Sequence, residues 1–171
     1  MMDTEKMFYE ILEGREKRAQ LQRQLITEYK STLISFTLNI PGINKLGKNF
    51  KKVYEKGIEE LEEEFLKKNI LVMYGKTNSS NAGYEAFFCV AKDPITIKKM
   101  TTDIEERSKL GRLFDFDVFD NNYKLLSRTE VGLPRRRCLL CDGIAAECSR
   151  SRKHSVEDVL NKINEIIEDS F

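Results

Sequence analysis

The clearest indication of the fold is the segment Gly111-Arg112-Leu113-Phe114-Asp115-Phe116-Asp117-Val118, whose alternating apolar residues are typical of a β-strand. Strands rarely contain aspartate, yet this one has two. Side chains at i and i+2 of a strand point to one face, so Asp115 and Asp117 are expected within ~7 Å of each other. Two carboxylates that close repel each other unless one is protonated or a cation binds them, and Mg²⁺ prefers oxygen ligands. The segment predicts a metal-binding strand; the alternative is an edge strand with both aspartates solvated.

The residues around this strand extend the prediction to phosphate chemistry. A turn at 120–122 and a second strand at 123–127 predict an antiparallel hairpin. Such a hairpin would bring Arg112 and Arg128 to one end, where guanidinium groups can bind phosphate in a bidentate manner. Glu105, or its neighbour Glu106, could supply a third carboxylate from the end of the preceding helix. The alternative is two ordinary surface arginines.

The remaining segments alternate between helical and strand patterns. Apolar periodicity and capping residues predict the following elements: helices over 4–13 and 15–30 separated by Gly14, a strand over 33–40, a helix over 47–68, a strand over 70–74, a polar loop over 75–83, a strand over 84–91, a helix over 93–106 and a C-terminal helix beginning at Ser155. We therefore expect an α+β fold formed by one domain, residues 1–171. Its sheet is predicted to be mixed, with four or five strands and helices packed around them.

The composition limits the possible functions. The 171 residues suffice for one well-packed domain, and a net charge of +1 offers no overall attraction to nucleic acid. The N-terminal segment is too charged for a signal peptide, and no apolar run is long enough to cross a bilayer. We expect a cytoplasmic protein that binds neither nucleic acid nor membranes. Its four cysteines are then free thiols or metal ligands, and Cys89, in an apolar run, is expected in the core.

A second candidate site lies in the C-terminal third of the chain. Cys138, Cys141, Cys148 and His154 have the spacing C-x2-C-x6-C-x5-H, which resembles a zinc site with three thiolates and one imidazole. However, Cys141, Ala145 and Cys148 are also spaced like a packed stripe on a helix, and His154 could simply precede the last helix. Both interpretations remain open at the level of sequence.

Two further groups of basic residues are candidate binding residues. Lys45 lies in the loop after the strand 33–40, where its ammonium group could bind phosphate. The helix 15–30 begins with a basic stretch that includes Arg15 and Arg18, which could dock an acidic partner or could simply be solvated.

Taken together, these stretches resemble the apo-citrate lyase phosphoribosyl-dephospho-CoA transferases, the CitX family. The similarity covers nearly the whole chain and is carried by Arg15-x-x-Arg18, the segment 35–42, the segment 111–118, Ser127-Arg128, the segment 137–141, Ala145-Ala146, Cys148, Arg150 and His154-Ser155. The resemblance implies a nucleotidyltransferase-like transfer of 2′-(5″-triphosphoribosyl)-3′-dephospho-CoA to a serine of the citrate lyase acyl carrier (gamma) subunit, with release of diphosphate.

On this basis we expect metal-dependent phosphoryl transfer. Asp115 and Asp117 would act as catalytic ligands of Mg²⁺ or Mn²⁺, with Glu105 as the third carboxylate. Phosphate charge would be neutralised by Arg112, Arg128 and Lys45, while Arg15 and Arg18 bind the carrier. The competing hypothesis is a small zinc module that contacts RNA or protein through the basic segment 135–137. That hypothesis gives the two aspartates no role.

Overall fold

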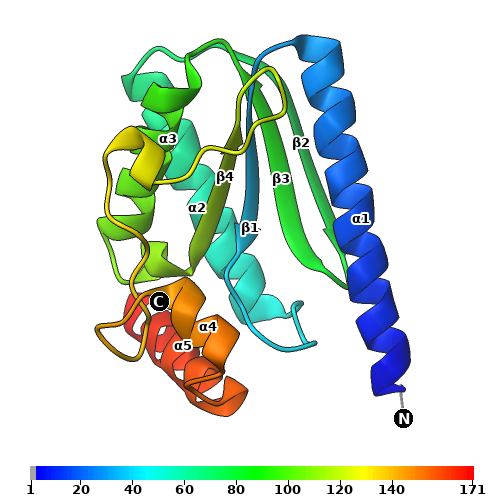
Figure 1. Cartoon of the computed structure of the whole chain (residues 1–171), viewed down its shortest axis with the longest axis vertical. Helices are drawn as coiled ribbons and strands as arrows, with labels where there is room; N and C mark the ends of the chain where they lie inside the picture. Colours follow the sequence, from blue (N-terminus) through cyan, green and yellow to red (C-terminus); the bar gives the residue numbers. More distant parts are fainter. Residues whose placement is uncertain (1–2) are drawn as a thin grey trace.

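The computed structural model describes residues 3–171 and confirms an α+β fold (Figure 1). Two short 3-10 turns, at Leu110–Leu113 and Thr129–Val131, supplement the longer elements. These are α1 (Thr4–Tyr29), β1 (Thr32–Leu38), α2 (Lys48–Lys67), β2 (Val72–Ser80), β3 (Gly83–Val90), α3 (Pro94–Glu106), β4 (Phe114–Phe119), α4 (Ala145–Ser151) and α5 (Val156–Ser170). Within the described residues, every helix is too short or too polar to cross a membrane.

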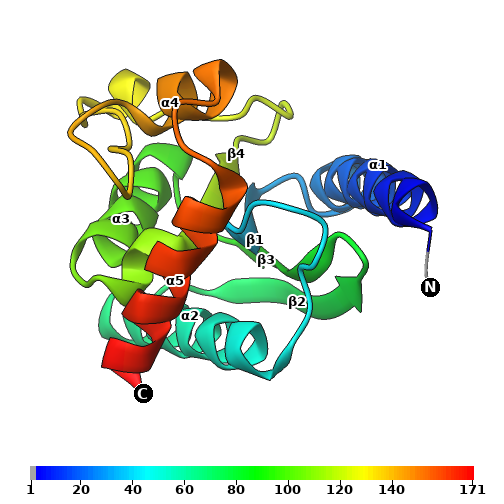
Figure 2. The ribbon, with the colours of Figure 1, turned by 90° about the horizontal axis from the view of Figure 1, so that it is seen from below.

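The four strands form one sheet in the order β2-β3-β1-β4, and all three pairings are antiparallel. The number of strands agrees with the sequence prediction, but the expectation of a mixed sheet is wrong. Helices α2, α3 and α5 cover one face and α1 lies against the other, as Figure 2 shows. The larger apolar core fills the first interface, and a smaller cluster that includes Cys89 lies beneath α1. The sheet is therefore a central layer between two unequal cores.

Helix α1 is one continuous helix of 26 residues, so the predicted break at Gly14 is wrong. A Cβ added at Gly14 would lie 2.8 Å from the Cβ of Ala82 and 2.9 Å from the Oγ of Ser80. The glycine therefore permits close packing of α1 against the β2–β3 turn, which outweighs its low helix propensity. The capping predictions are correct: Asp93 caps α3 before Pro94, and Ser155 accepts a hydrogen bond from the backbone of Asp158 at the start of α5.

Two predictions about the strands also need correction. The predicted polar loop 75–83 is mostly strand, because β2 runs to Ser80 and pairs with β3 along its whole length. The predicted strand at 123–127 is not formed. That segment contributes only an isolated bridge between Phe119 and Leu125, and β4 pairs with β1 instead.

Side chains, rather than another strand, cover the outer edge of β4. The amide of Phe116 donates to Glu105 (2.8 Å), and its carbonyl accepts from the ammonium of Lys98 (3.1 Å). The carbonyl of Phe114 accepts from Arg136 (3.0 Å). Glu105 and Lys98 are both buried, and Glu105 also pairs with Arg128 at 2.5 Å and with Arg136 at 3.1 Å. These bonds satisfy backbone groups that an exposed edge would leave open to other strands.

The position of Glu105 predicts a large contribution to stability. Glu105→Gln would leave the guanidinium groups of Arg128 and Arg136 without their shared carboxylate in a buried environment. We expect the free energy of unfolding, measured by urea denaturation, to fall by about 3 kcal/mol. The matched control is Glu106→Gln, because the 46% exposed side chain of Glu106 is the second partner of Arg128. This control should cost less than about 1 kcal/mol. Equal losses in the two variants would contradict the assigned role of Glu105.

Candidate functional site

Asp115 and Asp117 lie on one face of β4, as the alternation predicts. Asp115 is opposite Thr37 and Asp117 is opposite Ser35 on β1. The intervening Phe116 packs in the main core on the opposite face. Both aspartates are partly exposed, and the Asp115 side chain is 44% accessible. The two carboxylates therefore project from the face of the sheet that carries α1, beyond the strands that α1 covers.

The electrostatics of this pair favour a bound cation. Burial, together with the neighbouring charges of Asp115 and Glu105, raises the pKa of Asp117 to about 6, although Lys98 and Arg18 act in the opposite direction. A carboxylate with a raised pKa is held in an environment where its negative charge is poorly compensated. A divalent cation bound by both groups would supply the missing compensation. The chemistry of the pair thus fits the magnesium or manganese site predicted from sequence.

Asp115 opens into a large pocket of about 980 Å³. The pocket lies between the N-terminal half of α1, the loop after β1, the start of β4 and the segment that contains α4. Five arginines line it: Arg15, Arg112, Arg136, Arg137 and Arg152. The chain has 11 arginines and 18 lysines, yet none of the lysines lines this pocket. Arginine binds phosphate in a planar, bidentate manner that lysine cannot reproduce, so the pocket is suited to a phosphorylated ligand.

The structure separates the predicted substrate-binding residues into two groups. Arg112 and Arg15 line the pocket, and Arg112 donates to the carbonyl of Arg137 at 2.8 Å. Arg128, in contrast, is held by Glu105 and Glu106 at 2.5 and 2.6 Å. Lys45 donates to the carbonyl of Ile40 and is not among the residues that line the pocket. Of the predicted substrate-binding residues, only Arg112 and Arg15 are thus placed to meet a ligand in the pocket.

The remaining predicted residues of the site are engaged elsewhere. Arg18 pairs with the buried Glu85 at 2.7 Å, and Asn78 occupies the other oxygen of that carboxylate. Both oxygens of Glu105 have partners at the edge of β4, while its charge is close enough to Asp117 to help raise the pKa of that carboxyl. Among residues 3–171, no group that includes Asp115 and two further carboxylate, thiol or imidazole ligands lies within 4.8 Å.

Sequence reasoning missed Arg136 as a member of the site. Its guanidinium donates to the carbonyl of Phe114 at 3.0 Å and lies 3.6 Å from the carboxylate of Asp115 and 3.1 Å from that of Glu105. It therefore joins the edge of β4 to the exposed aspartate. The run of arginines at 135–137 was a visible signal, but sequence alone could not show which arginine points toward β4.

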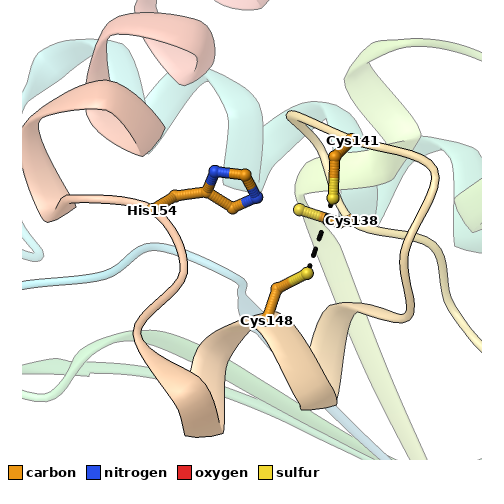
Figure 3. A group of neighbouring side chains, drawn as sticks. All are labelled: Cys138, Cys141, Cys148 and His154. Carbon is orange, nitrogen blue, oxygen red and sulfur yellow. Dashed lines mark hydrogen bonds between the residues drawn. The ribbon is translucent and has the colours of Figure 1, made fainter.

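The four residues of the Cys–His segment converge in space (Figure 3). The ligand atoms of Cys138, Cys141, Cys148 and His154 all lie within 4.8 Å of one another, which forms a candidate metal site. Cys148 lies on α4, whereas Cys141 lies in the loop before it, so the alternative of a continuous helical stripe is wrong. Cys138 and Cys148 also line the pocket, which places this metal site in the pocket wall.

Three features show that the segment fits a metal ion. The Nε2 atom of His154 is buried, has no hydrogen-bond partner in the described chain and points toward the sulfur atoms. Backbone amides of Leu140 and Gly143 lie 3.4 Å from the sulfurs of Cys138 and Cys141. The Gly143 amide is the main cause that lowers the pKa of Cys141 to about 6, which favours a thiolate. A Cβ at Gly143 would come within 3.1 Å of the Cys148 sulfur, so glycine leaves the space that these sulfurs need.

Comparison with known proteins gives a consistent result. A model of the apo-citrate lyase phosphoribosyl-dephospho-CoA transferase family matches residues 7–170. A Vibrio cholerae protein named a probable member is 37% identical over 161 residues, which are 94% of this chain and 90% of the relative. A Citrobacter koseri transferase of the same name is 32% identical over 94% of this chain and 88% of its own length. The "Protein CitXG" of Haemophilus influenzae is 37% identical over 91% of this chain, but the chain spans only 34% of that relative. This chain therefore belongs to the apo-citrate lyase phosphoribosyl-dephospho-CoA transferase family.

Proposed function

We propose that this protein transfers 2′-(5″-triphosphoribosyl)-3′-dephospho-CoA to a serine of the citrate lyase acyl carrier subunit. The observation that carries the proposal is the pair Asp115 and Asp117 on one face of β4, of which Asp115 lines an arginine-rich pocket, in a chain of this family. The serine oxygen forms a bond to the phosphorus next to the ribose, the bond to the outer two phosphates breaks, and diphosphate leaves. The hydroxyl proton is released as the phosphodiester forms.

Each of these residues has a proposed role in the transfer. Asp115 and Asp117 would hold Mg²⁺ or Mn²⁺, an ion that lowers the pKa of the attacking hydroxyl and offsets charge on the phosphates. Arg112 lines the pocket beside Asp115 and neutralises the departing phosphates. Arg136 is a positioning residue, because it holds the carbonyl of Phe114 and lies beside Asp115. We assign Glu105 and Arg128 to supporting β4 rather than to binding metal or phosphate.

We further propose that the Cys–His segment binds one structural Zn²⁺. Three sulfur ligands and one imidazole nitrogen form a closed set typical of structural zinc sites, and the partnerless Nε2 of His154 is available as the fourth ligand. The metal would fix the segment 137–154, which forms one wall of the pocket.

Intact mass measurement of the carrier tests the proposed reaction directly. Purified protein, the triphosphoribosyl precursor, the apo-carrier and Mg²⁺ should yield a carrier that has gained the mass of the precursor minus diphosphate. The same mixture with EDTA should leave the carrier unmodified. An unmodified carrier in the presence of Mg²⁺ would contradict the proposed function.

Arg15 is the one predicted docking residue that remains available to the carrier. It lines the pocket and has no ion-pair partner in the described chain. We expect Arg15→Gln to raise the KM for the carrier by roughly three- to tenfold, with a stronger effect at low salt. The control is Lys17→Gln, because Lys17 lies on the same helix and pairs only with the exposed Glu13. A KM that changes for the precursor but not for the carrier would place Arg15 at the small substrate instead.

The zinc module that binds RNA or protein is not favoured. The family match spans nearly the whole chain, and the Cys–His segment shares its pocket with Asp115. A separate binding module would not explain this shared geometry.

A further inference from the structure

Two arginines carried by the Cys–His segment face the pocket without a protein partner. Arg137 and Arg152 both line the pocket, and within the described chain neither side chain forms an ion pair or a hydrogen bond. Arg112 and Arg136, in contrast, are held by backbone carbonyls of neighbouring segments. Arg137 and Arg152 are therefore the pocket-lining cations of this segment whose donors remain available to a ligand.

The candidate metal site brings together the two backbone segments that carry these arginines. Arg137 directly precedes Cys138, and Arg152 lies between Cys148 and His154. Since the ligand atoms of these cysteines and of the histidine lie within 4.8 Å of one another, the two backbones are brought together at the same pocket wall. The carbonyl of Arg137 is fixed further by Arg112, and its backbone forms a bridge with Ile144. Both arginines therefore extend from backbone segments that are held in place by these contacts, rather than from free loops.

The backbone of Arg152 adds an independent argument. Arg152 ends α4 in the left-handed region, with φ of 51°. Glycine adopts this conformation without strain, whereas a residue with a Cβ is strained there. Lys30 ends α1 in the same region, but of these two residues only Arg152 has a side chain that lines the pocket.

We propose that Arg137 and Arg152 form a second phosphate subsite, which binds the diphosphate bridge in the dephospho-CoA part of the precursor. This inference rests on the proposed function, in which the substrate carries two separate polyphosphate groups. The triphosphate must lie at Asp115 and Asp117, because the transferred phosphorus reacts there. The diphosphate that joins adenosine to pantetheine then needs its own cations, and two guanidinium groups match its four terminal oxygens in number and geometry. A pocket of about 980 Å³ is at the upper end of the range for small-molecule sites, as such a ligand requires.

Two donors and two variants test this subsite. One donor is the full precursor, and the other is 2′-(5″-triphosphoribosyl)adenosine, which lacks the diphosphate and pantetheine. We expect Arg152→Gly and Arg137→Gln each to raise the KM for the full precursor about tenfold, with kcat unchanged. The KM for the truncated donor should stay the same. Arg150→Gln is the matched control, because Arg150 lies on the same segment but outside the pocket, and it should not change KM.

The substitution of Arg152 by glycine distinguishes an effect on ligand binding from an effect on folding. Arg152→Gly should unfold at the same urea concentration as wild type or at a higher one, because glycine relieves the left-handed backbone. Equal KM changes for the two donors, or no change for either, would overturn the subsite.

Calorimetric titration with dephospho-CoA alone distinguishes failure of the subsite from failure of the proposed function. Binding that weakens about tenfold in both variants supports the subsite, even if the carrier is never modified. Carrier modification by a wild-type protein that does not bind dephospho-CoA would overturn the subsite while leaving the function intact.

Discussion

Asp115→Asn and Asp117→Asn are each expected to slow carrier modification by about a thousandfold. A bound metal ion supplies several kcal/mol of transition-state stabilisation, and about 1.4 kcal/mol corresponds to a factor of ten in rate. Asparagine keeps the shape of the side chain but removes the charge that holds the cation. The rate is measured from the mass of the carrier over time at saturating Mg²⁺. Asp103→Asn is the matched control, because Asp103 is a 71% exposed aspartate on α3, and its rate should equal that of wild type. Either site variant with a wild-type rate would contradict the assignment of catalytic metal ligands.

The same Asp117 variant should make the metal-free protein more stable at neutral pH. The pKa of Asp117 is raised in the folded state to about 6 from an ordinary value near 3.8, mainly by burial. The folded protein therefore binds this proton more tightly than the unfolded chain, and its contribution to stability is lost as pH rises through about 6. Asp117→Asn avoids that loss, with an expected gain of about 1–2 kcal/mol at pH 7.5 and almost none below pH 4. Urea denaturation in EDTA at the two pH values measures the difference. A loss of stability at pH 7.5 would mean that the rate effect reflects misfolding.

Sequence patterns correctly predicted the features of this fold that depend on residues close together in the chain. The alternation around Asp115 and Asp117 gave their shared face, and the caps at Asp93 and Ser155 gave the starts of two helices. The wrong predictions concern features of the fold that depend on tertiary contacts. Gly14 was read as a helix break, but its packing partner Ala82 is 68 residues away. The turn after β4 predicts a hairpin partner next to it in sequence, yet β1 pairs with β4 along the whole length of β4.

The candidate site illustrates the same limit for charged residues. Residue type and spacing identified Arg112 and the four residues of the Cys–His segment, because metal ligands have characteristic spacing. Sequence could not distinguish Arg128 from Arg136. Arg128 forms ion pairs with two glutamates, whereas Arg136 lies beside Asp115. Both are arginines near the same strand, and only three-dimensional packing shows which carboxylates are close enough to engage each one.

Loss of the proposed zinc ion from the Cys–His segment should abolish carrier modification while leaving the sheet folded. The core between the sheet and the helices α2, α3 and α5 contains none of the four ligands, so its packing does not depend on them. Structural zinc sites supply most of the folding free energy of small segments, and here the segment 137–154 has little apolar core of its own. Cys138→Ser should therefore lose one equivalent of zinc, keep the circular dichroism of the sheet and helices, and become sensitive to trypsin at the arginines of this segment. Elemental analysis and mapping of the cleavage sites measure these effects.

Cys89→Ala is the matched control for the metal site, because Cys89 is buried in the other core and lies away from the cluster. It should retain one zinc per chain and remain resistant to trypsin within 137–154. In Cys138→Ser, the rate of carrier modification should fall below about 1% of the wild-type rate. Unfolding of the segment 137–154 would displace Arg136 and Arg137 together. Since Arg136 holds the start of β4 beside Asp115, we expect the binding of Mn²⁺ at the proposed aspartate site to weaken as well. A Cys138→Ser protein that binds Mn²⁺ as tightly as wild type would show that the two metal sites are independent.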